Sequence, residues 1–206
     1  MSIFISIHQL DLLFQIEIHA ERCIRAVMYA HAVSKTDVNM WAFTQNCFAE
    51  SAIIHWCKIF GSRNEPTHYT KFFNNEFFNL SDGTRLTANS ILARFCKSAG
   101  ISESEYLSIW DKIKAGRDKF FVHNDFTESS RPELPDLDFL KSMALELRDI
   151  IHDIIPQVDA DDKEFYTNFK NYVQWNTNKK YLNDLQKDFD LFRKAIYQIT
   201  NTESGH

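Results

Sequence analysis

The first long stretch of the chain, residues 7–33, has its apolar side chains at the spacing of an α-helix and contains neither glycine nor proline. The apolar residues that share one helical face are Leu10, Leu13, Phe14, Ala20, Ile24, Val27 and Met28. Only 5 glycines and 4 prolines occur in all 206 residues. Because a sheet protein needs many tight turns, this scarcity favours long helices. The sequence therefore predicts an all-α fold.

One domain is expected over residues 1–206, because a chain of this length can form a single core and no linker divides it. Periodic apolar residues, caps and breakers predict helices over about residues 7–33, 37–60, 69–78, 87–98, 102–124 and 136–155. The helical core should cover about residues 6–156. Two further helices over about residues 160–200 form a C-terminal extension that packs on the bundle or on a partner.

The helix predicted over residues 37–60 has apolar side chains on two sides. Its second side carries Phe43, Cys47 and Ile54. Since a helix that is apolar all round is usually buried, we expect it to be central.

The cysteines indicate a reducing environment. All four lack Cys-x-x-Cys spacing and stand on apolar stretches: Cys23, Cys47, Cys57 and Cys96. Such a cysteine is usually a small buried hydrophobe, so we predict reduced thiols and a cytoplasmic location. The apolar start of the chain meets His8 and Asp11 too soon for a signal peptide or a membrane span. We predict a soluble protein that does not contact a membrane.

Arg117 interrupts an apolar stripe on the helix predicted over residues 102–124. The stripe consists of Tyr106, Ile109, Trp110, Ile113, Phe120 and Phe121. An unpaired buried guanidinium costs several kcal/mol, so Arg117 must meet a carboxylate inside the protein or face a cleft open to an anion. In the first case, Arg117 would pair with Glu17 or Glu21, and His123 would only stabilise the helix end.

The second case gives Arg117 and His123 a chemical role. An imidazole with a pKa of about 6.5 can exchange a proton with a ribose hydroxyl. A guanidinium can hold a phosphate through two parallel hydrogen bonds. Arg117 and His123 are therefore the candidate catalytic pair, with Asp118 and Asn124 as supporting residues.

The spacing of Arg117 and His123 favours a homodimer. Six residues of helix separate the two side chains by about 9 Å in height and about 120° in direction. One copy would reach a single phosphate with both only through the length of Arg117 or a distorted helix end. A two-fold dimer would bring the Arg117–His123 motifs of both copies to one site. The small residues Ala115 and Gly116 would let a helix of the second copy approach closely.

The motif resembles that of a known family. An arginine, five residues and a histidine followed by Asn-Asp, as in residues 117–125, is similar to the Arg-x(4–6)-His signature of the HEPN superfamily. The segments Ile54–Ser62 and Thr67–Tyr69 resemble the AbiU-like abortive-infection branch, and the likeness covers most of residues 1–155. It implies a HEPN-type antiparallel helical bundle, here with additional C-terminal helices.

This resemblance also implies an activity. The chain would be a metal-independent endoribonuclease of a prokaryotic antiphage defence or toxin-antitoxin system. The 2′-hydroxyl of RNA would attack the adjacent phosphate, so DNA, which lacks this hydroxyl, would not be cut. Its partners would be RNA, a second copy, and an antitoxin or defence-system protein.

Charge leaves an alternative open, because the formal net charge is −5. Nucleic-acid binding needs clustered Lys and Arg. Lys114 and Lys119 beside Arg117 could contact a few phosphates, but the sequence has no extended basic stripe. The alternative is a non-catalytic HEPN helical dimer that binds a protein or a nucleotide.

The remaining histidines predict neither a metal nor a cofactor. No pair at i, i+4 spacing has a third ligand. We expect His55 and His68 to be packed and hydrogen-bonded. The aromatic run from Tyr69 to Phe78 is expected in the core or an interface, with base stacking as the less favoured reading.

Overall fold

The computed structural model describes residues 3–33, 39–73, 78–81, 83–118 and 136–203. Eight α-helices and one short 3-10 helix, η3 (Ile155–Gln157), make up nearly all regular structure in these ranges, so the all-α prediction is confirmed. The α-helices are α1 (Ile7–Val33), α2 (Asn39–Phe60), α3 (Thr70–Phe73), α4 (Ala88–Ala99), α5 (Glu103–Gly116), α6 (Leu137–Ile154), α7 (Lys163–Trp175) and α8 (Asn178–Glu203).

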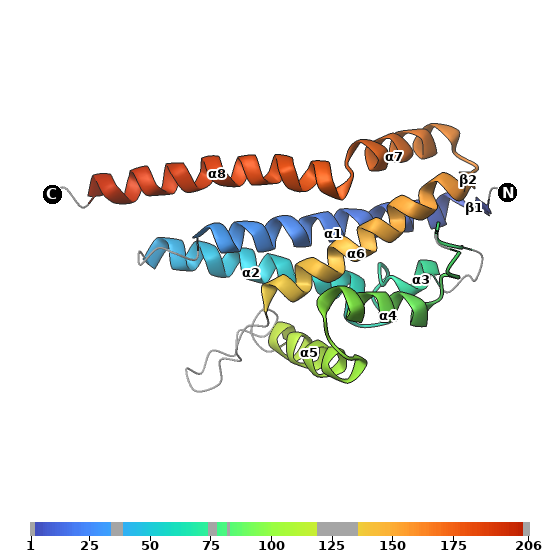
Figure 1. The fold of residues 1–206 in the computed structure, drawn as a ribbon, viewed down its shortest axis with the longest axis horizontal. Coiled ribbons are helices and arrows are strands. Elements are labelled where there is room, and N and C mark those ends of the chain that lie inside the picture. Colours follow the sequence, from blue (N-terminus) through green and yellow to red (C-terminus); the bar gives the residue numbers. More distant parts are fainter. Residues whose placement is uncertain (1–2, 34–38, 74–77, 82, 119–135, 204–206) are drawn as a thin grey trace.

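Helix α1 is the centre of the molecule. It packs along α2, which runs antiparallel to it, and is crossed by α6, while α8 extends along its other side (Figure 1). Helices α4 and α5 lie on the side opposite α8. Fully buried side chains cover a broad arc of α1, among them Leu10, Leu13, Cys23 and Ala30. This arc is wide because α2, α6 and α8 all pack against α1.

The start of α5 follows the capping signals in the sequence. Gly100 adopts φ 68° and closes α4 in the left-handed conformation. The Ser102 side chain then accepts from the backbone N–H of Glu105, and Glu105 accepts in return from the N–H of Ser102. Helix α5 runs to Gly116, and Arg117 and Asp118 continue it as a wider π-helical turn. The remainder of the predicted helix, residues 119–124, lies outside the described part of the chain.

A small parallel sheet was not predicted. Strand β1 (Ile3–Ile5) pairs with β2 (Val158–Ala160), with Ile3 opposite Val158 and Ile5 opposite Ala160. Three residues are too few to show the period-2 alternation that identifies a strand. The sheet joins the beginning of the chain to the segment after α6.

The second face of α2 corrects a prediction. Phe43 is 70% exposed, Ile54 is 42% exposed, and Cys47 is also exposed. No described element covers this face, so α2 is not enclosed as expected. The other three cysteines are buried.

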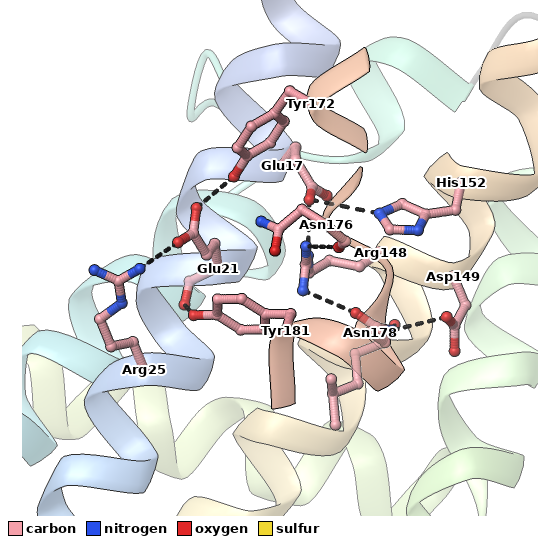
Figure 2. A network of polar contacts seen from close by, with 11 residues as sticks. Glu17, Glu21, Arg25, Arg148, Asp149, His152, Tyr172, Asn176, Asn178 and Tyr181 are labelled. Carbon is pink, nitrogen blue, oxygen red and sulfur yellow. Dashed lines mark hydrogen bonds and ion pairs between the residues drawn. The ribbon is translucent and has the colours of Figure 1, made fainter. Parts of the chain in front are cut away.

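A buried ion pair joins α1, α6 and the start of α8 (Figure 2). Arg148 donates from Nε to Glu17 Oε1 at 2.7 Å, and both side chains are 0% exposed. Its other nitrogens donate to Asn178 Oδ1 at 2.8 Å and to the Asn176 carbonyl at 2.9 Å. The Tyr181 ring lies 4.5 Å from the guanidinium carbon. Every guanidinium nitrogen of Arg148 is therefore bound inside the protein.

We predict that Arg148→Ala destabilises the protein strongly. Removing the guanidinium leaves Glu17 buried without its cation, which typically costs roughly 3 to 5 kcal/mol. Urea denaturation should report the loss in the free energy of unfolding. Arg94→Ala is the matched control, because Arg94 pairs with Glu146 at the partly exposed surface; it should cost about 1 kcal/mol or less. Equal losses in the two variants would contradict the role of the buried pair.

Candidate functional site

Arg117 lies at the edge of the protein, where α5 ends. Its side chain is 18% exposed. Nε donates to Asp118 Oδ1 at 2.8 Å, and a second nitrogen lies 2.7 Å from the same oxygen. A third nitrogen lies 3.9 Å from Glu65 Oε1, and Lys58 binds the other oxygen of Glu65 at 2.9 Å. We call Lys58, Glu65, Arg117 and Asp118 the Arg117 cluster.

The alternative in which Arg117 pairs with Glu17 or Glu21 is ruled out. Glu17 binds Arg148, and Glu21 accepts from Arg25 and from the Tyr172 hydroxyl, each at 2.5 Å. The two acids that border the apolar face of α1 are thus bound by other residues. Arg117 is paired at the protein edge, not inside the core.

Local structure fixes the Arg117 cluster. The Trp110 indole N–H donates to the Phe60 carbonyl at 2.6 Å, which docks α5 onto the end of α2. Next comes Gly61, where a Cβ atom would lie 2.5 Å from the Cys57 carbonyl oxygen, so only glycine fits without a shift. The loop then folds back, with the Thr67 hydroxyl donating to the Lys58 carbonyl at 2.9 Å. This return brings Glu65 beside Arg117.

Two histidines meet next to this cluster. His19 Nδ1 of α1 lies 2.9 Å from His55 Nδ1 of α2, so one ring donates and the other accepts. Burial, followed by the charges of Arg22 and Lys58, lowers the pKa of His19, while Glu65 acts in the opposite direction. Burial, followed by His19 and Arg22, lowers the pKa of His55 to about 4. The pair is therefore neutral near pH 7. The sequence predicted a hydrogen bond for His55 but not its partner, which is 36 residues away.

Of the other predicted site residues, the structure describes Lys114 and Asp118. Lys114 lies about one turn of α5 before Arg117, and its Nζ is 4.9 Å from the centre of the Trp110 ring. Asp118 binds Arg117 directly, and its supporting role stays a prediction. His123, Asn124 and Lys119 lie outside the described residues.

Two other expectations concern His68 and the aromatic run. His68 is buried and bonds the Thr70 hydroxyl at 2.8 Å, as predicted for a packed histidine. The described aromatic residues that follow are buried, which favours the core reading over base stacking: Tyr69, Phe72, Phe73 and Phe78. In the described ranges, no three His, Cys, Asp or Glu side chains gather as a metal site would require.

Comparison with known proteins adds no relative. No family model, curated protein or solved structure matches the chain. None of the described helices is both long and apolar enough to cross a membrane. Any functional assignment therefore depends on the motif and on the side chains around it.

We predict that stability falls as the pH is lowered from 7 to 5. Burial lowers the pKa of both His55 and His68 to about 4 in the folded protein, against about 6.5 in an unfolded chain. The unfolded state therefore takes up protons that the folded state does not, and stability present above pH 6.5 is lost toward pH 4. Urea denaturation at several pH values would measure this slope.

The variant His55→Gln should make the free energy of unfolding depend less on pH, by the equivalent of at most one bound proton. His8→Gln, at an exposed position of α1, is the control and should leave this dependence unchanged. A wild-type stability that does not change between pH 7 and 5 would refute the proposed burial of neutral histidines.

Proposed function

We propose that the protein is a metal-independent endoribonuclease of the HEPN type, acting in the cytoplasm in a prokaryotic defence or toxin-antitoxin system. One observation carries this proposal. Arg117 lies at a partly exposed helix end, and the two acids of α1 that might have required it, Glu17 and Glu21, are bound by Arg148, Arg25 and Tyr172. Its charge is therefore not needed by the core.

In the proposed reaction, the 2′-hydroxyl of RNA attacks the adjacent phosphorus while the bond to the 5′-oxygen breaks. The attacking hydroxyl loses a proton and the leaving 5′-oxygen gains one, which gives a 2′,3′-cyclic phosphate and a 5′-hydroxyl. His123 serves as general acid or base. The Arg117 guanidinium holds the phosphate and offsets the charge that develops on it.

For this chemistry, the Asp118 carboxylate must move away from the Arg117 guanidinium. It occupies two nitrogens of Arg117 and is 46% exposed, so it can turn toward solvent when a phosphate arrives. We propose that Asp118 holds the guanidinium in a fixed orientation before RNA binds. Asn124 is proposed as a second supporting residue, and Lys114 and Lys119 as weak RNA contacts.

A second candidate function is a non-catalytic module that binds a protein or a nucleotide. The pairing of Arg117 with two carboxylates favours it, because the cluster of Lys58, Glu65, Arg117 and Asp118 has no net charge. In this case Arg117 would fasten the loop that carries Glu65 to the end of α5.

Catalysis predicts a specific pattern of cleavage. Purified protein should cut mixed RNA in EDTA and leave DNA intact. His123→Ala should lower the rate by roughly 10²- to 10⁴-fold, the usual contribution of a general acid or base. Arg117→Lys should also impair cleavage strongly, since lysine lacks the planar pair of donors. Arg94→Lys is the matched control and should keep the wild-type rate.

Thermal melts of the same variants separate the two candidate functions. Arg117→Ala should lose little stability if the guanidinium serves a phosphate. A loss of stability large enough to explain the lost activity, or full activity of His123→Ala, would refute the catalytic assignment.

The proposed enzyme is a homodimer. The uncovered apolar face of α2, formed by Phe43, Cys47 and Ile54, offers a surface for a second copy. Gly116 beside Arg117 is compatible with close approach of another helix. A partner in the same system, such as an antitoxin, could cover this face instead.

We predict the mass of a dimer in light scattering at micromolar concentration. Phe43→Asp should shift the protein to monomer, since it places a charge in the apolar interface. Leu107→Asp, at an exposed position of α5 (57% exposed), is the control and should remain dimeric. A monomeric wild-type protein would contradict the predicted assembly.

A further inference from the structure

A groove of about 460 Å³ lies between α1 and α7. Helix α7 runs beside the first half of α1, on the side away from α5 (Figure 1). Ligand sites for small molecules typically enclose about 300 to 1,000 Å³. The groove is therefore large enough for one nucleotide unit.

Aromatic rings form one wall of this groove. Phe14 of α1 meets three rings of α7 edge-on, with centroid distances of 5.6 Å to Phe165, 5.4 Å to Phe169 and 6.3 Å to Tyr172. Phe14 and Phe165 are only half-buried. The groove thus offers apolar ring surface against which a flat base can pack.

The other wall is charged. Glu21 holds Arg25 at 2.5 Å and also accepts from the Tyr172 hydroxyl (Figure 2). Arg22 is exposed at the rim and, within the described ranges, forms neither an ion pair nor a hydrogen bond. A guanidinium in this position is available to an anion.

Trp175 extends the aromatic surface beyond the groove. It is 71% exposed, and Lys180 Nζ lies 3.1 Å from its ring centre. Tyr172 lines both the groove and the adjoining depression that contains Trp175. An exposed indole beside a lysine is the kind of platform on which single-stranded nucleic acids stack their bases.

We infer that the α1–α7 groove and Trp175 bind single-stranded RNA. One base packs against Phe14 and Phe165, the adjacent phosphate binds Arg22, and a neighbouring base stacks on Trp175. The inference rests on the proposed function, because it takes RNA as the substrate and names where the strand is held outside the Arg117 cluster.

Arg22 links this surface to the histidine pair. It is near enough that its charge contributes to lowering the pKa of both His19 and His55, after the larger effect of burial. Lys58 and Glu65 of the Arg117 cluster also act on His19. Arg22 of the groove and Lys58 of the Arg117 cluster therefore both act on the same histidine, His19.

Binding of a 2′-O-methyl hexa-adenylate tests the inference, because this RNA lacks the attacking hydroxyl and stays intact. Fluorescence anisotropy in EDTA at low salt would measure its dissociation constant. Arg22→Ala and Trp175→Ala should each weaken binding by roughly ten-fold, as expected for one phosphate or one stacking contact. The matched controls Arg193→Ala and Phe4→Ala change exposed residues elsewhere and should stay within about two-fold.

Two outcomes would overturn the inference: no binding by the wild-type protein, or losses in the controls equal to those in the two test variants. Arg117→Ala separates this surface from the nuclease: it should stop cleavage of unmodified RNA, and in its background Arg22→Ala and Trp175→Ala should still weaken hexa-adenylate binding by the same factors. If no RNA is cut and the Arg22 and Trp175 losses persist, the nuclease proposal fails and the binding surface stands.

Discussion

The buried ion pair between Glu17 and Arg148 is the constraint on which the arrangement of the helices depends. Burying two charges costs least when they pair with each other and when further hydrogen bonds satisfy their remaining donors and acceptors. Arg148 meets this condition through Glu17, the Asn176 carbonyl and Asn178. These partners come from α1, from the α7–α8 connection and from the first residue of α8, so the position of the C-terminal helices is coupled to the core.

This pair also decides which arginine is available at the surface. Glu17 is bound by Arg148, and Glu21 is bound by Arg25 and Tyr172. Neither acid therefore needs the charge of Arg117. Arg117 can then be held at the end of α5 by acids that are partly exposed. A phosphate can compete with partly exposed carboxylates more readily than with buried ones, because their release into water has a small desolvation cost.

Local signals in the sequence predicted the local structure. The helical spacing of residues 7–33 gave the bounds of α1 correctly, and Ser102 with Glu105 marked the start of α5. Gly100 marked the end of α4 as expected. In each case the determining contacts lie within a few residues along the chain.

Features made by distant residues could not be predicted in the same way. Arg148 stands among apolar residues of α6, and nothing in the spacing reveals its partner 131 residues away. The His19–His55 contact and the β1–β2 pairing depend equally on how the helices pack. The exposed face of α2 was misjudged because an apolar side chain signals burial without telling whether its own chain or another supplies the cover. The motif resemblance identified Arg117, but its pairing with Glu65 required the fold.

Resonances of the arginine Nε–H groups test most directly whether Arg117 serves an anion while Arg148 serves the core. A ¹H–¹⁵N titration with a 2′-O-methyl oligonucleotide should shift the Nε resonance of Arg117, because phosphate replaces the Asp118 oxygen that this group now binds at 2.8 Å. The Nε resonance of Arg148, bound to Glu17 without solvent contact, should stay in place. An Arg117 resonance that does not move when the RNA is saturating would contradict the proposed role.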